Sequence, residues 1–281
     1  MDPLYSLGLF AAAFGASALG GVLGMASGIF IVPALTLWAG VDIRVAIAAS
    51  IVSVIACSCG SAAPFLKHRL TNIRLALVLE VATTLGALTG VFLIGLVPVQ
   101  YLYGLFAAVL AVSAQQMLAR RADPVGASAD RLATRLRLHG SYPDRALGRD
   151  VAYQVSRVPM GLSLMYGAGL ISALLGIGSG VLKIPAMDTA LRLPIKVSSA
   201  TSNFMIGVTA AASGAAYFVR GDIDTAIAGP VALGSVVGAL LGARLLMGLP
   251  ADKLRLFFVA VLAVLAVQMA ASALGLQGGP A

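Results

Sequence analysis

The sequence predicts an all-α integral membrane protein built from two homologous helical repeats. Three observations predict this fold class. First, 59% of the 281 residues are hydrophobic, only 11% are charged and the mean hydropathy is +0.97, whereas soluble domains carry about a quarter charged residues. Second, continuous apolar runs recur along the chain near the length of about 20 residues that a helix needs to cross a bilayer, without the alternation of β-barrel strands. Third, the second half of the chain repeats the first.

The repeat emerges when the chain is shifted by 152 positions, which aligns residues 19–119 with 171–271 without a gap. We therefore expect a first transmembrane repeat at 1–119, a basic linker at 120–157 and a second transmembrane repeat at 158–281. Many aligned residues are identical, and they include small residues at the spacing that lets helices approach closely. The identical pairs include Gly24/Gly176, Ser27/Ser179, Gly28/Gly180, Pro33/Pro185, Ser50/Ser202, Gly86/Gly238, Gly90/Gly242, Pro98/Pro250 and Gln116/Gln268.

Each repeat is expected to hold a helix pair broken by glycine and proline, followed by three spans. In the first repeat an apolar helix over 4–23 ends at a glycine-rich break, and a short helix over 29–39 carries Pro33 in its first turns. Glycine loosens a helix by its backbone freedom, and proline removes a hydrogen-bond donor and clashes with the preceding turn. Three spans follow, at 43–66, 75–96 and 99–119.

The linker at 120–157 is the extended polar stretch of the chain, with eight arginines against four aspartates. Residues 128–138 are predicted to form a short amphipathic helix that is capped by Ser128, stopped by Gly140 and laid on the cytoplasmic headgroups. The linker shows no sign of a separate catalytic domain.

The distribution of positive charge favours inverted repeats. If the linker is cytoplasmic, the basic turn at 67–74 is also inside when each span crosses once. The loops of the second repeat keep their positive charge inside only if the broken segment at 158–191 enters the membrane and returns to the same side. We therefore expect a returning broken pair plus three spans in each repeat and both termini outside. Eight spans in parallel repeats remain the alternative.

The two matched breaks are the candidate binding site, because paired interrupted helices in the halves of a membrane protein indicate a transport site. A short helix that starts at a break presents free N–H groups and the positive end of its dipole to an anion. Serine, threonine and asparagine at the breaks and at the following span starts could add neutral donors, or could bond their own helix carbonyls. The predicted substrate-binding residues are Gly24, Ser27, Gly28, Ser50, Gly176, Ser179, Gly180, Lys183, Thr201, Ser202 and Asn203.

Lys183 and Glu80 are charged residues within apolar segments. Lys183 lies within one turn of the second break, and its aligned residue is Ile31. A charge in a bilayer must face a cavity or a counter-charge. Asp188, five positions on, points elsewhere on a helix and more naturally pairs with Arg192, which leaves Lys183 available to a substrate anion. Glu80 could relay a proton or balance a basic residue.

Several function classes find no support in the sequence. It holds no HExxH, GxSxG or Walker A motif and no clustered metal ligands, so we expect no enzyme, cofactor or metal site. The net charge of +8 reflects basic loops that touch lipid headgroups, and no basic patch interleaved with aromatic residues indicates nucleic-acid binding. Cys57 and Cys59 lie two apart in one apolar run and should not form a disulfide.

Taken with their order in the chain, these motifs resemble the TauE/SafE sulfite exporter family, also called domain of unknown function 81. The resemblance covers nearly the whole chain except the linker. In each copy it consists of a glycine-rich segment ending in proline, a hydroxyl-bearing helix start, a polar turn and a Gly-xxx-Gly span. These are 24–33, Ser50, 67–74 and 86–90, then 176–185, Thr201 with Ser202, 220–224 and 238–242. The resemblance implies export or uptake of small anions such as sulfite, sulfonates or other organosulfur compounds.

Together, the breaks and the resemblance predict a secondary transporter of small anions that works by alternating access in a cell membrane, as a multi-pass protein of the bacterial inner membrane. Its expected partners are the anionic substrate, a coupling ion and the lipid bilayer. The alternative is a non-transporting membrane partner or sensor that passes sulfur compounds to a cytoplasmic enzyme, for which the basic linker is the sequence support.

Overall fold

The computed structural model describes residues 3–23, 27–67, 69–118, 130–144, 149–246 and 251–274. In chain order the first half forms helices α1 (Pro3–Leu23), α2 (Gly28–Pro33), α3 (Ile43–Lys67), α4 (Ile73–Ile94) and α5 (Val99–Leu118), with a π-helical turn η1 (Ala34–Trp38) after α2. The linker contains α6 (Arg131–Arg135) and a hairpin of β1 (Gly140–Asp144) and β2 (Arg149–Tyr153). The second half forms α7 (Val158–Leu175), α8 (Gly180–Thr189), α9 (Ile195–Arg220), α10 (Thr225–Leu246) and α11 (Ala251–Ala273).

Helices lie on both sides of each predicted break, and helices also cover the three apolar runs that follow each break. α7 stops because Gly176 takes a left-handed conformation with φ +65°, which ends a helix at little cost only for glycine. In the first half the short helix begins at Gly28 and continues past Pro33 into the π-helical turn, where the Ala39 N–H bonds to the Ala34 carbonyl. Proline lacks the N–H of the regular helix ladder, and the change of hydrogen-bond register follows directly after it.

Helices of one half pack chiefly against helices of the other. α1 packs along α10 and α7 packs along α4; α3 contacts both α9 and α10, α9 also contacts α4, and α5 packs against α11. Glycines let the backbones touch: a Cβ at Gly86 would lie 2.0 Å from the Tyr166 carbonyl oxygen, and one at Gly238 would lie 2.2 Å from that of Phe14. Gly86 and Gly238 are 152 positions apart, and so are their partners Phe14 and Tyr166, so the repeat makes the same contact twice.

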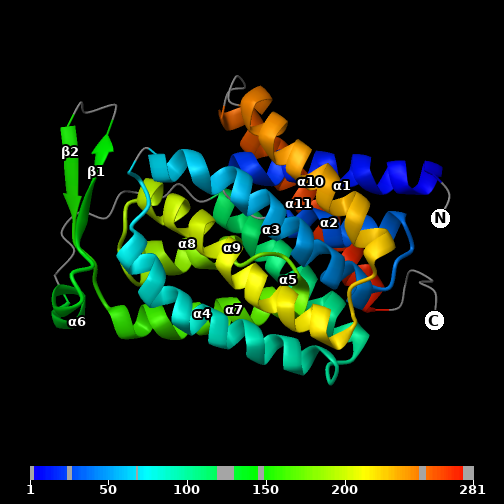
Figure 1. Ribbon diagram of the computed structural model, residues 1–281, viewed down its shortest axis with the longest axis horizontal. Helices are drawn as coiled ribbons and strands as arrows, with labels where there is room; N and C mark the ends of the chain where they lie inside the picture. Colours follow the sequence, from blue (N-terminus) through cyan, green and yellow to red (C-terminus); the bar gives the residue numbers. More distant parts are fainter. Residues whose placement is uncertain are drawn as a thin grey trace.

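The two long helices that precede the breaks run in opposite directions along the bundle (Figure 1). α7 begins beside the hairpin, at the left of the view, whereas α1 begins at the opposite end, where α11 also ends. Among the described residues, α4 and α7 are long and apolar enough to cross a membrane by length and composition alone. Shorter apolar helical segments within α1, α3, α5, α10 and α11 and across α2 and η1 accompany them.

The linker differs from the prediction of one amphipathic helix over 128–138. The helix covers only Arg131–Arg135, and its cap is Asp130, whose Oδ1 accepts the Leu132 N–H at 3.1 Å; Ser128 lies outside the described residues. Asp130 Oδ2 also accepts the Val158 N–H, which fixes the linker to the start of α7. After α6 the chain turns into the hairpin instead of continuing as a helix.

The side chain of Asn72 joins the linker and its hairpin to the bundle. Asn72 caps α4 through its Oδ1, and its Nδ2 donates to the Leu138 carbonyl and, at 2.9 Å, to the Tyr153 hydroxyl. Burial raises the pKa of Tyr153 above its ordinary value, and the hydrogen bond from Asn72 opposes part of that rise.

Candidate functional site

The two breaks meet inside the bundle. A Cβ at Gly28, the first residue of α2, would lie 2.1 Å from the Gly176 carbonyl oxygen, so the two backbones are in direct contact. Ser50 of α3 donates to this same carbonyl at 2.7 Å and has the Ile47 carbonyl as a second acceptor. The structure therefore brings together four predicted site residues, Ser27, Gly28, Ser50 and Gly176, while Gly24 lies outside the described residues.

Hydroxyl groups at the first break bond to one another. Ser27 Oγ lies 2.9 Å from Ser53 Oγ of α3, and Ser53 Oγ bonds in turn to Ser235 Oγ of α10. All three side chains are buried. Ser27 thus has a partner inside the protein, and this network links the first break to α3 and α10.

The aligned serine at the second break has no such partner. Ser179 precedes α8 and is 1% exposed, and its hydroxyl has no hydrogen-bond partner in the described part of the chain. The reason is visible in the repeat: the residue aligned with Ser53 is Met205. The Ser179 carbonyl accepts the N–H groups of Leu182 and Lys183; those of Gly180 and Val181, at the start of the helix, have no acceptor within it.

One turn into α8, Lys183 forms a buried charged cluster with α4 and α9. Its Nζ lies 3.3 Å from Glu80 Oε2 and donates to Thr209 Oγ1 at 2.6 Å. Thr209 also bonds to Glu80 Oε1, and Thr84 lies 3.3 Å from the same oxygen. Lys183 is fully buried and Glu80 is 7% exposed. Lys183, which we expected to be available to a substrate anion, here has Glu80, 103 positions away, as its counter-charge, so Glu80 balances a basic residue as one of its two expected roles.

This charged cluster has an apolar counterpart in the first repeat. The residues aligned with Lys183, Thr209 and Glu80 are Ile31, Cys57 and Ala232. Cys57 is buried and is not in a disulfide, as predicted for both cysteines. One place in the repeat therefore holds an ion pair in one half and small or apolar side chains in the other.

The predicted site residues at the start of α9, Thr201, Ser202 and Asn203, differ in their hydrogen-bond partners. Thr201 Oγ1 accepts the N–H of Asn72 at 3.1 Å and so holds the turn that precedes α4. Asn203 Nδ2 donates to the Ser199 carbonyl of its own helix. Ser202 is buried, and its hydroxyl has no partner among the described residues.

Sequence reasoning missed Thr209, Ser53 and Ser235. A signal for Thr209 was present, because Ser202, Thr209 and Ser213 recur seven and four positions apart, which places small polar side chains along one face of α9. All three are buried.

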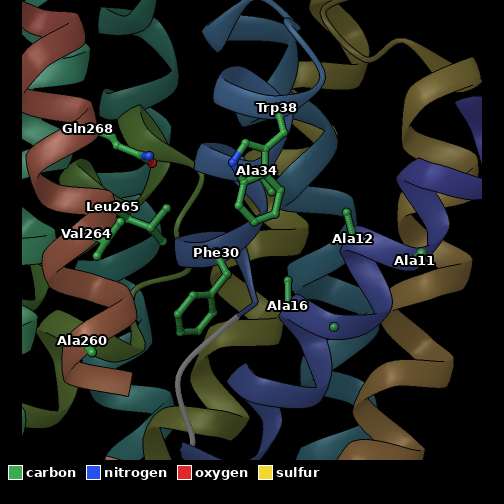
Figure 2. Close-up of a pocket in the computed structure, with 11 residues that line it drawn as sticks. Ala11, Ala12, Ala16, Phe30, Ala34, Trp38, Ala260, Val264, Leu265 and Gln268 are labelled. Atoms are coloured by element: carbon green, nitrogen blue, oxygen red, sulfur yellow. The ribbon is translucent and has the colours of Figure 1, made fainter. Parts of the chain in front are cut away.

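A cavity of about 560 Å³ lies beside α2 and not between the breaks (Figure 2). It is bounded by α1, by α2 with η1, and by α11, and its lining is apolar apart from Gln268, which extends from α11 toward η1. The buried Oε1 of Gln268 has no hydrogen-bond partner among the described residues.

A smaller cavity of about 340 Å³ lies between α7 and α8. Much of its lining aligns with that of the larger one: Ser163, Leu164, Gly167, Ala168, Leu182 and Ala186 align with Ala11, Ala12, Gly15, Ala16, Phe30 and Ala34. The two helix pairs at the breaks thus leave hollows at matching positions.

A model of the sulfite exporter TauE/SafE family matches residues 9–269, which is nearly the whole chain. The chain belongs to the TauE/SafE family. As a member, it is a membrane protein of a transporter family, and the resemblance inferred from the motifs is confirmed.

Relatives agree with this family. The probable membrane transporter protein YunE of Bacillus subtilis is 25% identical over 240 residues, covering 82% of this chain and 84% of YunE. The probable membrane transporter protein MamO of Magnetospirillum gryphiswaldense is 31% identical over 109 residues, 36% of this chain and 17% of MamO, so that match is to a small part of a longer protein. A second MamO, from Paramagnetospirillum magneticum, is 30% identical over 112 residues, covering 37% of this chain and 18% of that protein. No solved structure matches the chain.

Proposed function

We propose that this TauE/SafE protein is a secondary transporter of small anions and that it holds a sulfite or sulfonate group at the start of α8. The observation that carries this proposal is the Ser179 hydroxyl, which is buried beside the first N–H groups of α8 and has no partner among the described residues. A buried polar group without a hydrogen bond is costly, so a ligand that accepts one would be stabilised there.

The chemistry at this end of α8 suits an anion with several acceptor oxygens. The N–H groups of Gly180 and Val181 lie at the positive end of the helix dipole. Ser179 and Lys183 are four positions apart, so both side chains lie on one face of the helix. A sulfonate carries three oxygens, which could accept from the hydroxyl, the amides and the ammonium together.

The arrangement of the helices supports inverted repeats. The packing of α7 on α4 repeats that of α1 on α10 with matching residues, and α1 and α7 run in opposite directions (Figure 1). We place the linker at the cytoplasmic face and both termini outside, in a multi-pass protein of the bacterial inner membrane. Because α1 packs on a helix of the other repeat, the two bodies that rock during alternating access would each contain helices of both repeats.

Flux measurements test the proposal. The purified full chain in proteoliposomes should take up labelled sulfite or a labelled sulfonate, and Ser179→Ala should lower that uptake about tenfold by removing one donor to a charged ligand. Ser113→Ala is the matched control, since that buried serine donates to the Val109 carbonyl of its own helix and its loss should leave uptake unchanged. Uptake by this chain alone would also exclude the partner or sensor alternative. Absence of uptake for every small sulfur anion would overturn the proposal.

A further inference from the structure

We propose that the Glu80–Lys183–Thr209 cluster couples anion binding to a proton: an anion can reach Lys183 only when Glu80 is protonated, so each anion is carried together with one proton. This inference rests on the anion site proposed above and names the coupling ion for it. Nothing in the family match or in the names of the relatives assigns such a role.

Charge balance is the first argument. In the structure the buried ammonium and carboxylate lie 3.3 Å apart and sum to zero charge. An anion that bound beside them would leave one net negative charge in a low-dielectric site, which is strongly unfavourable. If a proton from water adds to the Glu80 carboxylate, the pair becomes a neutral acid and a free ammonium. The arriving anion then restores zero net charge.

Geometry gives Lys183 two places to go. The Lys183 Nζ contacts Glu80 in the structure, and its helical face also carries Ser179, one turn back at the start of α8. A lysine side chain is long and its ammonium donates in several directions. When Glu80 becomes neutral, the ammonium can turn toward an anion at Ser179 without leaving a buried carboxylate unpaired.

Thr209 provides the switch between the two states. Its hydroxyl has one proton to donate and two acceptors in reach, Glu80 Oε1 and the Met205 carbonyl at 3.1 Å. With Glu80 ionised the proton favours the carboxylate, because hydrogen bonds to charged acceptors are stronger. When Glu80 is protonated, the Thr209 hydroxyl donates to the Met205 carbonyl instead, so the hydroxyl keeps a hydrogen-bond acceptor.

Other ionisable groups do not compete for this proton. Helices α4, α7, α8 and α9 surround the pair. The other ionisable side chains described on these helices either bond to groups outside the cluster or point away from it. Tyr166 donates to Thr89, Tyr217 donates to the Ala173 carbonyl, and Arg220 pairs with Asp222. Arg74 is exposed at the start of α4, and Asp188 is five positions beyond Lys183, which points it to another side of α8.

Methanesulfonate is the probe for the test, because a sulfonate keeps its single charge across the neutral pH range and cannot itself supply the proton. The purified full chain in detergent is mixed with the probe in weakly buffered solution that contains a pH indicator, and binding is measured in parallel by calorimetry. We expect uptake of about one proton per anion bound, and an affinity that rises about tenfold for each unit by which the pH falls while Glu80 is ionised.

Variants separate coupling from binding. Glu80→Gln imitates the protonated acid, so it should bind methanesulfonate with an affinity independent of pH and without proton uptake. Asp222→Asn is the matched control, because it removes a carboxylate from an exposed ion pair and should keep the proton uptake of the original chain. If Glu80→Gln does not fold, the proton count for the original chain decides alone. Binding of the probe without proton uptake, at equal affinity from about pH 6 to about pH 8, would overturn the coupling and leave the anion site standing. Failure of the original chain to bind any small sulfur anion would overturn the anion site itself.

Discussion

The two breaks lie at aligned positions of the repeat and differ in what their side chains do. At the first break, Ser27 bonds to Ser53, and Ile31 and Ala232 stand at the positions aligned with Lys183 and Glu80. At the second, Ser179 has no partner among the described residues and a lysine–glutamate pair lies one turn further along. A repeat can therefore duplicate an arrangement of helices without duplicating a site. We infer that the first break is closed by its own hydroxyls, while the second is kept open to a ligand.

The largest effect is expected from breaking the ion pair. Lys183→Ile, which copies Ile31 of the first break, leaves the Glu80 carboxylate buried without its partner and should lower the free energy of unfolding by about 3–5 kcal/mol. Adding Glu80→Ala and Thr209→Cys completes the residue set of the first repeat and should recover most of that loss. Thermal unfolding in detergent measures both. Equal stability of the single and triple variants would show that the cluster is not a unit.

The contact between the breaks gives the next largest effect. Gly28→Ala places a methyl group against the backbone of Gly176, so the two breaks must separate, at a cost of about 1–3 kcal/mol or more. Gly8→Ala in α1 is the matched control, since no atom lies within 4 Å of its added Cβ. That change should be neutral or slightly stabilising. If both variants unfold at the temperature of the original chain, the breaks do not touch.

The aligned serines should respond in opposite ways. Ser27→Ala removes a hydrogen bond and should destabilise the protein by about 1 kcal/mol without changing the affinity for a sulfonate. Ser179→Ala removes a buried hydroxyl without a partner in the described structure, so stability should hold or rise while sulfonate affinity falls. Unfolding and binding measured on the same two preparations check this prediction. Loss of affinity in both variants would mean that the two breaks bind together.

The smallest effect lies at the hairpin, far from either break. Tyr153→Phe removes one of two acceptors of the Asn72 amide and should cost about 0.5–1.5 kcal/mol. Because burial raises the pKa of Tyr153, the original chain should lose stability as the pH rises above about 10, the pKa of an unfolded tyrosine. Tyr153→Phe should lose less over that range. The control is Tyr101→Phe, at an exposed position of α5.

Much of the fold followed from local signals. Glycine and proline inside apolar runs located both breaks, and the 152-position shift predicted that every helix of one half has a counterpart in the other. The hairpin was missed because the strands of the linker are short and their pairing is a contact between segments, while Asp130 and not Ser128 caps the helix before them.

The site was predicted less completely than the fold. Backbone features such as Gly28 and Gly176 are set by local sequence, and they were found. The partner of Lys183 was not, because Glu80 lies 103 positions away and no spacing rule connects two helices of different halves. Their aligned residues, Ile31 and Ala232, are both apolar. Each of these two opposite charges aligns with an apolar residue in the other repeat. This shared departure from the repeat was the signal that could have paired Lys183 with Glu80.

A structure of the full chain with bound 2-bromoethanesulfonate tests the central claim most directly, because the anomalous signal of bromine locates the ligand without interpretation of shape. The account predicts a bromine peak beside the start of α8, with the sulfonate within hydrogen-bond distance of Ser179 and the Gly180 N–H. A peak beside Ser27, or in the apolar cavity lined by Gln268, with Ser179 still lacking a partner, would contradict it.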